Sequence, residues 1–401
     1  MSEQARPTLT PGVLGALGFV AMAGSLATDL YLPSFPHLQE DLGVSASVVQ
    51  LTLTAFLVGA AIGQFAVGTV SDALGRRRTL LVALALYALA GFGSAAMFSI
   101  EGVIALRFLQ GVFGSVGASL ARAIVADIAE NRQQATRGIS IVVAMMGVGP
   151  VFGSPLGALL VEWGGWRLTL AGLAAVATAM VVVTALVIPE SLPPDARHPT
   201  RIRPLLANLA RLGRDGSFLG YALSYGLTYG AFIVYIGSSS FIVQNVFDQS
   251  PVMYSLAFSA GSLCFVGGAL LNARLARRIG ADVALRAAHL LAFAAAGALV
   301  VLAVGGSLTF AAWIPLSCLF IAGIAGGMSN STALALGRAG FAVGAGSASL
   351  GLAQYVLAAA ASPLGGLWGD DTALPATIGM LGGAALALIA AASGRAAERR
   401  R

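Results

Sequence analysis

The sequence predicts an all-α integral membrane protein with twelve transmembrane helices, and three observations support this fold class. Of the 401 residues, 57% are hydrophobic and only 10% are charged, whereas about a quarter of the residues in soluble domains are charged. Apolar stretches long enough to cross a bilayer, roughly 17–25 residues each, recur from Gly12 to Ala392. Arginines cluster in every second connection between these stretches. The composition therefore excludes a water-soluble protein.

The apolar stretches set the predicted spans and their orientation. We expect spans at residues 12–34, 46–70, 79–98, 102–126, 138–161, 166–188, 217–244, 252–273, 283–304, 309–334, 343–367 and 373–393. Connections on one side carry acidic residues and almost no arginine, and the other side carries nearly all the arginines. Because basic connections stay inside the cell, we expect a multi-pass protein of the inner (plasma) membrane with both termini in the cytoplasm.

The excess of arginine over acidic residues reflects this topology. All 23 basic residues are arginine, and they lie in the connections instead of forming a basic stripe on a soluble domain, so nucleic-acid binding is not expected. Cys264 and Cys318 both fall inside spans and offer neither a disulfide framework nor metal-ligand spacing. His289 is expected to pack at the cytoplasmic edge.

One long polar, proline-rich segment divides the chain. "PESLPPDARHPTRIRP" at residues 189–204 predicts a six-helix half at 1–188, a cytoplasmic linker at 189–216 and a second six-helix half at 217–401. "GTVSDALGRRR" at 68–78 has a degraded counterpart in "GALLNARLARRIG" at 268–280. Two repeated halves are typical of transporters that rock around a central site.

The connection between the second and third spans carries the strongest motif. Gly68, Asp72 and Gly75 precede Arg76 and Arg77 in a very short loop, where glycine permits a tight turn. The arginines could act only to fix the orientation of the spans in the membrane. Alternatively, Asp72 could form a charge contact that breaks when the two halves separate. The segment resembles the Gly-x-x-x-Asp-x-x-Gly-Arg-Arg/Lys loop of the major facilitator superfamily. The resemblance implies the major facilitator fold, with two pseudo-symmetric six-helix halves, and a gating role for these five residues.

Asp29 is an acidic residue predicted to lie inside or near the outer part of the first span. Intramembrane acids are costly and are functional candidates by default, although a carboxylate at the water interface is the alternative. "DLYLPSFP" at 29–36 resembles the first span of the twelve-span drug:proton antiporters, particularly the bicyclomycin and chloramphenicol resistance (Bcr/CflA) subgroup. That resemblance implies that Asp29 binds and releases the coupling proton.

The fourth span contains Arg107, Gln110, Arg122 and Asp127. A buried arginine needs a partner, and Asp29 is the natural candidate for Arg107. "RFLQG" at 107–111 resembles the motif of proton-coupled family members, which implies a coupling role for Arg107 and Arg122 and a gating role for Asp127. Related sequences often have arginine where this chain has Ala126, which leaves the local charge network open.

The fifth span has glycines at intervals of four, at Gly149, Gly153 and Gly157, with Pro150 between them. Small residues at this spacing let helices pack closely, and a packing seam alone would explain them. "GPVFGS" at 149–154 also resembles the antiporter signature Gly-Pro-x-x-Gly-Gly, with Ser154 in place of the last glycine.

In the seventh span Tyr221, Tyr225, Tyr229 and Phe232 share a helical face, with Tyr235 nearby. The stripe could be packing, or it could form the apolar wall of a cavity that binds a drug-like molecule. We predict that Tyr225, Tyr229, Phe232 and Tyr235 bind substrate, with hydrogen bonds from Gln110, Asn330 and Gln354.

These features predict a proton-coupled exporter of drug-like small molecules such as antibiotics, working by alternating access. A proton-coupled sugar, amino-acid or metabolite exporter is the alternative within transport, and it would require a more polar pocket. A membrane enzyme and a passive channel are weaker alternatives. We expect no use of ATP, because no phosphate-binding loop occurs, and no metal or cofactor besides protons, because no metal-ligand motif such as His-Glu-x-x-His appears. Membrane lipid surrounds the chain, and the family resemblance implies a monomer.

Overall fold

The structure is a computed structural model. It describes residues 8–193, 197, 202–340, 343–366 and 371–400. Over these residues the chain is helical, with no strand.

The elements follow one another along the chain with short connections. In order they are α1 (Pro11–Ala21), α2 (Ala23–Asp29), η1 (Leu32–Ser34), α3 (Phe35–Leu42), α4 (Ala46–Leu74), α5 (Arg76–Ala95), α6 (Ile100–Ile128), α7 (Arg132–Val187), α8 (Ile202–Leu212), α9 (Gly216–Phe241), the π-helical η3 (Ile242–Val246), α10 (Pro251–Ile279), α11 (Ala281–Val304), α12 (Phe310–Arg338), α13 (Val343–Ala361), η4 (Ser362–Gly366) and α14 (Leu374–Arg399).

The helices agree with the predicted spans. Among the described residues, nine helices are long and apolar enough to cross a membrane, or ten if the bent pair Pro11–Ala21 and Ala23–Leu42 is one span. The 56-residue α7 contains two helices, because Gly164 and Gly165 break the helical conformation inside it. With α7 counted twice and α13 included, the helices match the twelve predicted spans.

Side-chain caps explain where many helices begin. The hydroxyl of Ser99 accepts a hydrogen bond from the backbone N–H of Gly102 at the start of α6. Asn131 caps α7 in the same way, and the carboxylate of Asp215 accepts from two N–H groups at the start of α9. These caps satisfy backbone donors that have no partner inside the helix. The helix ends are thereby set by local sequence.

The chain divides into two compact units by its internal contacts. Unit 1 contains residues 1–34 and 58–200, and unit 2 contains residues 35–57 and 201–401. The long α4 contributes its first part to unit 2 and the remainder to unit 1. The division of the chain at the 189–216 linker stays a prediction, because contacts group residues by packing and not by order along the sequence.

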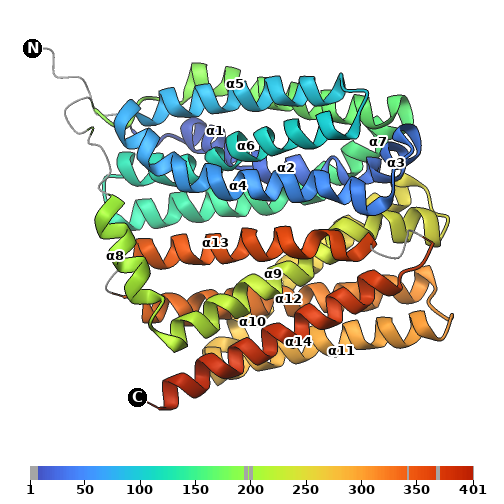
Figure 1. Ribbon diagram of the computed structural model, residues 1–401. Coiled ribbons are helices and arrows are strands. Elements are labelled where there is room, and N and C mark those ends of the chain that lie inside the picture. Colours follow the sequence, from blue (N-terminus) through green and yellow to red (C-terminus); the bar gives the residue numbers. More distant parts are fainter. Residues whose placement is uncertain (1–7, 194–196, 198–201, 341–342, 367–370, 401) are drawn as a thin grey trace, which may run out of the picture. The chain divides into compact units, whose positions relative to one another are not determined.

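In unit 1, α7 packs against α1, α2 and α5, and α6 packs against α1, α2 and α5 (Figure 1). The first predicted span is bent by 41° between α1 and α2. It ends in the 3-10 turn η1, which contains Pro33. This arrangement places the end of α2 against α7.

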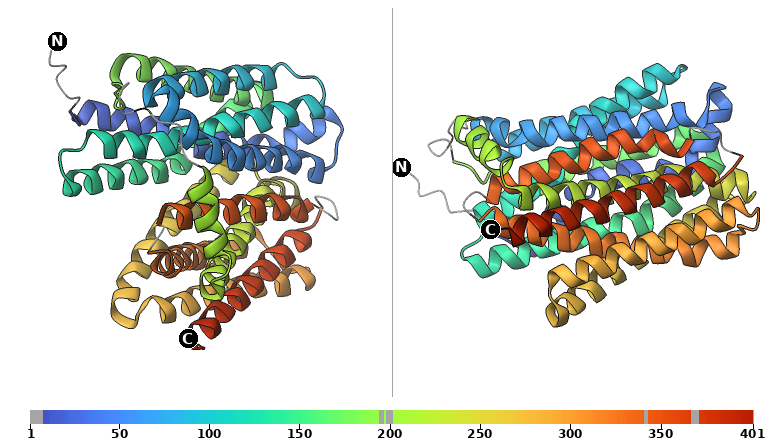
Figure 2. Two further views of the ribbon diagram at one scale, coloured as in Figure 1. Left: turned by 60° about the vertical axis from the view of Figure 1, so that its left-hand side comes forward. Right: turned by 60° about the horizontal axis from the view of Figure 1, so that its bottom comes forward.

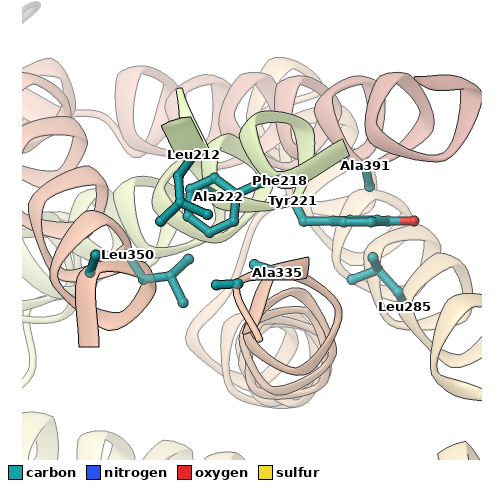
Figure 3. Packing of buried hydrophobic residues seen from close by; sticks show 10 residues of the cluster. Leu212, Phe218, Tyr221, Ala222, Leu285, Ala335, Leu350 and Ala391 are labelled. Carbon is teal, nitrogen blue, oxygen red and sulfur yellow. The ribbon is translucent and has the colours of Figure 1, made fainter. Parts of the chain in front are cut away.

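In unit 2, α9 packs against α12, α13 and α14, as the views in Figures 1 and 2 agree. One end of α9 lies in an apolar core that includes Leu285, Ala335, Leu350 and Ala391. Figure 3 shows the ring of Tyr221 between Leu285 and Ala391. Side chains from α11, α12, α13 and α14 meet α9 in this core, so this end of α9 is closely packed.

Candidate functional site

Asp29 is the last residue of α2 and is 5% exposed. The hydroxyl of Thr28 donates a hydrogen bond to Oδ1 at 3.2 Å. Oδ2 is buried and has no hydrogen-bond partner among the described residues. A buried polar atom without a partner is costly and calls for an explanation, such as a catalytic role or a bound ion or water molecule. The carboxyl group is thus placed where a single proton could bind to it.

Arg107 is fully buried in α6. Nη1 donates a hydrogen bond to Oε1 of Gln110 at 3.2 Å, and the guanidinium lies 4.5 Å from the centre of the Tyr31 ring. No ion pair joins Arg107 to Asp29 within the described part of the chain. An amide oxygen and an aromatic face are therefore among the partners of this cation, where the sequence suggested the carboxylate.

Arg122 lies on α6 fifteen residues beyond Arg107, which is roughly 22 Å along a helix. Its side chain is partly exposed. The structure therefore does not bring Arg122 to Arg107, although the sequence grouped the two residues. The coupling role of Arg122 stays a prediction.

The three glycines at intervals of four in α7 face the first predicted span. A Cβ atom at Gly149 would lie 2.6 Å from Oγ of Ser25, and one at Gly153 would lie 3.4 Å from Cβ of Asp29. A Cβ at Gly157 would overlap the carbonyl oxygen of Leu30. These glycines let α7 pack directly on α2. The seam therefore positions Asp29, besides being a packing surface.

The loop between α4 and α5 forms a charge network around Arg76. Its guanidinium donates to Oδ1 of Asp72 at 2.5 Å and to Oδ2 of Asp127 at 3.1 Å. Its backbone N–H donates to Oε1 of Glu190 at 2.9 Å. Arg76 thus fastens the ends of α4 and α6 to the segment after α7. An arginine before Asp127 is not needed for this network, although the sequence left that point open at Ala126.

Two further features of the network depend on this loop. Gly75 has a φ of +97°, and a Cβ atom there would lie 2.5 Å from Oε2 of Glu190, so only glycine suits the turn. Nη2 of Arg77 donates to the carbonyl oxygen of Ala185 at 2.6 Å. The surroundings of Gly68 fall outside the described residues. Sequence reasoning missed Glu190, because the linker motif gives no sign that this acid returns to the loop.

The aromatic stripe of α9 continues into neighbouring helices of unit 2. Phe232 stacks on Tyr235 with ring centres 6.2 Å apart and on Phe265 of α10 at 5.5 Å. Tyr235 also stacks on Trp313 of α12 at 6.0 Å. Tyr229 lies 6.3 Å from Phe232, and both are partly exposed. We call Tyr229, Phe232, Tyr235, Phe265 and Trp313 the aromatic array.

The other predicted substrate residues lie outside the aromatic array and are bonded to other side chains. The hydroxyl of Tyr225 donates to Oε1 of Gln354 at 2.9 Å, which joins α9 to α13. Asn330 is buried and donates to Oδ1 of Asn272 at 2.9 Å. Gln110 belongs to unit 1, where it accepts from Arg107. Substrate binding by these three polar residues stays a prediction, and each already has a hydrogen-bond partner in the protein.

Comparison with known proteins identifies the family. The model of the Major Facilitator Superfamily matches residues 17–363. The chain belongs to the major facilitator superfamily. This facilitator is 35% identical over 364 residues to the uncharacterized MFS-type transporter YdgK of Bacillus subtilis, covering 90% of this chain and 89% of that one. It is 26% identical to a bicyclomycin resistance protein homolog of Haemophilus influenzae, over 69% of each chain.

A solved structure confirms the fold of this facilitator. A bacterial homolog of the human lysosomal transporter Spinster, in an inward-facing and unoccupied conformation, superposes with a TM-score of 0.74 at 13% identity, covering 98% of each chain. These comparisons confirm the predicted resemblance to the drug-efflux subgroup and the predicted fold. The protein is a multi-pass membrane transporter and not an enzyme.

Sequence reasoning missed a buried polar cluster in unit 2 of the facilitator. Nε2 of His289 lies 2.9 Å from Oγ of Ser224, and Oγ of Ser331 donates to the same Ser224 oxygen at 3.2 Å. These residues come from α11, α9 and α12. His289 is 3% exposed, so it is buried among the helices, and its place near the cytoplasmic edge stays a prediction. Spacing could not reveal the cluster, because each helix contributes only one or two of its members.

The two cysteines of the facilitator also come together. The thiols of Cys264 on α10 and Cys318 on α12 lie close enough to interact, and both lie near Tyr235. Each residue was expected to behave as an isolated apolar side chain within its span. Their separation by 54 residues gives no sign of the contact, which arises because α10 and α12 pack side by side.

Proposed function

We propose that this transporter exports drug-like molecules, including antibiotics, in exchange for protons. The observation that carries the proposal is the carboxyl group of Asp29, buried at the end of α2 with one oxygen lacking a hydrogen-bond partner among the described residues. The subgroup resemblance supports this role, as does the relative whose name refers to bicyclomycin resistance.

The exchange requires only that proton and substrate favour opposite states of the transporter. A proton would bind Asp29 in the outward-facing state and leave in the inward-facing state. Arg107, held by Gln110 and Tyr31, would influence that acid through its charge without an ion pair. Asp72 would stabilise one gate through Arg76. No cofactor besides the proton takes part in this scheme.

We assign substrate binding to the partly exposed rings of the aromatic array. Tyr229 and Phe232 present flat apolar surface, and the hydroxyl of Tyr225 on the same helix is bonded to Gln354. Flat aromatic surfaces with few polar groups suit apolar, drug-sized ligands. A sugar or amino-acid exporter would need free polar groups in its binding site, whereas the predicted polar residues Asn330 and Gln354 are bonded within the protein.

The decisive experiment measures substrate-dependent proton movement in proteoliposomes with an imposed pH gradient. The panel contains chloramphenicol, bicyclomycin, a sugar and an amino acid. Asp29→Asn is compared with Asp248→Asn, which makes the same change at an exposed position with a φ of +52° that asparagine also tolerates. We expect gradient-driven antibiotic transport in the wild type and in Asp248→Asn, and its loss in Asp29→Asn.

Three results would contradict the proposal in different ways. Undiminished transport by Asp29→Asn removes this residue from coupling. Transport at a rate that does not depend on the pH gradient indicates an uncoupled carrier or a channel. Gradient-driven movement of the sugar or amino acid alone indicates the metabolite exporter.

We further infer that the transporter lies in the inner membrane as a monomer, with its arginine-rich connections and both termini in the cytoplasm. The arginine pattern supports this orientation. A phosphatase fused after Arg401 should be inactive if the terminus is cytoplasmic, and an active fusion would contradict the orientation. Light scattering in detergent should give the mass of one chain.

A further inference from the structure

Unit 1 contains an apolar groove that the proposed transport mechanism does not use. Its volume is about 280 Å³, and it lies between α4, α5 and α6. Its walls include Val67 and Val70 of α4, Val82 of α5 and Val116 of α6. Val70 is 41% exposed and Val82 is 53% exposed, so the groove is open along one side. A polar ligand would lose its hydration here without gaining hydrogen bonds.

The charged side chain lining this groove is Arg78, in the first turn of α5. It is the third of three consecutive arginines. Arg76 binds Asp72, Asp127 and Ser71, and Arg77 binds a backbone carbonyl group. Within the described part of the chain, Arg78 makes no hydrogen bond or ion pair, and its side chain is exposed. Its positive charge is therefore available to a ligand in the groove.

The combination of apolar walls and one free cation specifies an amphiphilic anion. Phospholipids supply such a ligand in any bilayer, and basic side chains near the membrane surface attract anionic headgroups. Arginine can also extend its head to the headgroup level while its stem covers apolar surface. We propose that the groove binds one acyl chain of an anionic phospholipid, with the lipid phosphate contacting Arg78.

Two kinds of variant separate the contributions of the Arg78 charge and of the apolar walls to lipid binding. Arg78→Gln removes the cation and leaves the groove intact. Arg137→Gln is the matched control, because Arg137 is also exposed in unit 1, lies outside the groove and has no ion pair in the described structure. Val82→Trp fills the groove while keeping Arg78, and Val70→Phe does so from α4.

Native mass spectrometry of the full-length protein in detergent can measure the bound lipid. The probes are dioleoyl phosphatidylglycerol, dioleoyl phosphatidylcholine and glycerol 3-phosphate, which has the charge without the chains. We expect one retained phosphatidylglycerol, weaker phosphatidylcholine binding and no glycerol 3-phosphate binding. Arg78→Gln should weaken phosphatidylglycerol binding about fivefold, as expected for one basic side chain near a headgroup, and Arg137→Gln should not.

The groove-filling variants test the apolar half of the site. Each should lose retained phosphatidylglycerol while its thermal unfolding midpoint stays within a few degrees of the wild type. If Val82→Trp unfolds early, Val70→Phe provides the test. Equal losses in Arg78→Gln and Arg137→Gln would overturn the proposal, because the attraction would then be general. Full lipid retention by a folded groove-filling variant would also overturn it.

Discussion

Nε of Arg76 donates a hydrogen bond to Oδ2 of Asp127, 51 residues further along the chain. The same guanidinium bonds Asp72, so one side chain joins the ends of α4 and α6. The side chain of Arg76 is 14% exposed, and its two acidic partners are 35% and 25% exposed. The network is therefore partly shielded from water.

We predict that Arg76→Ala lowers the free energy of unfolding by about 1–3 kcal/mol, because hydrogen bonds to charged groups contribute more than exposed ion pairs. Arg76→Lys should restore only part of this loss, since lysine lacks the forked guanidinium. Tryptophan fluorescence during thermal unfolding can measure the effect. Arg137→Ala serves as a control, and an equal loss in that variant would contradict the role of the network.

Close packing at the glycine seam predicts that alanine is harmful at Gly157 and harmless at Gly15, which lies outside the seam. Gly157→Ala should destabilise unit 1 by about 1–3 kcal/mol, because the new methyl group meets the backbone of Leu30, which cannot rotate away. Gly15→Ala on α1, where nothing lies within 4 Å of the added atom, should be neutral or stabilising by up to about 1 kcal/mol. Thermal unfolding of both variants compares them directly, and equal behaviour would show that α7 does not pack this closely.

The aromatic array predicts a change in affinity for apolar drugs. Phe232→Ala removes a ring that stacks on both Tyr235 and Phe265. We expect an aromatic antibiotic to bind about tenfold more weakly, because it loses one aromatic contact and the apolar area buried there. Phe152→Ala removes a ring that is 67% exposed on α7 and should leave affinity unchanged. Scintillation proximity binding can compare the two, and unchanged affinity in Phe232→Ala would place the substrate elsewhere.

The cysteine contact predicts a specific cross-link. Treatment with diamide should oxidise the thiols of Cys264 and Cys318 to a disulfide, with two electrons and two protons passing to diamide, which becomes the hydrazine. Maleimide labelling after denaturation should then count no free thiol, compared with two before treatment. Cys318→Ser should keep its one remaining thiol. Two free thiols after treatment of the wild type would show that α10 and α12 do not hold the cysteines together.

Much of the fold was predictable because a bilayer restricts the choices. A span must be about 20 apolar residues long, so hydropathy alone located the helices, and the break at Gly164 and Gly165 agrees with the predicted boundary between the fifth and sixth spans. The Gly149, Gly153 and Gly157 spacing also predicted close packing, because residues four apart lie on one helix face. The partner helix was not predictable from that spacing.

The sequence by itself determined the membrane class, the approximate positions of the spans, the turn at Gly75 and the family, because each depends on residues that are near one another in the chain. Tertiary structure alone decided which side chains meet. It placed Gln110 and Tyr31 beside Arg107, Glu190 on Arg76, His289 among serines and Cys264 against Cys318. The physical reason is that a buried polar group is satisfied by whichever neighbour the helix packing brings within about 3 Å, and one sequence does not reveal that neighbour.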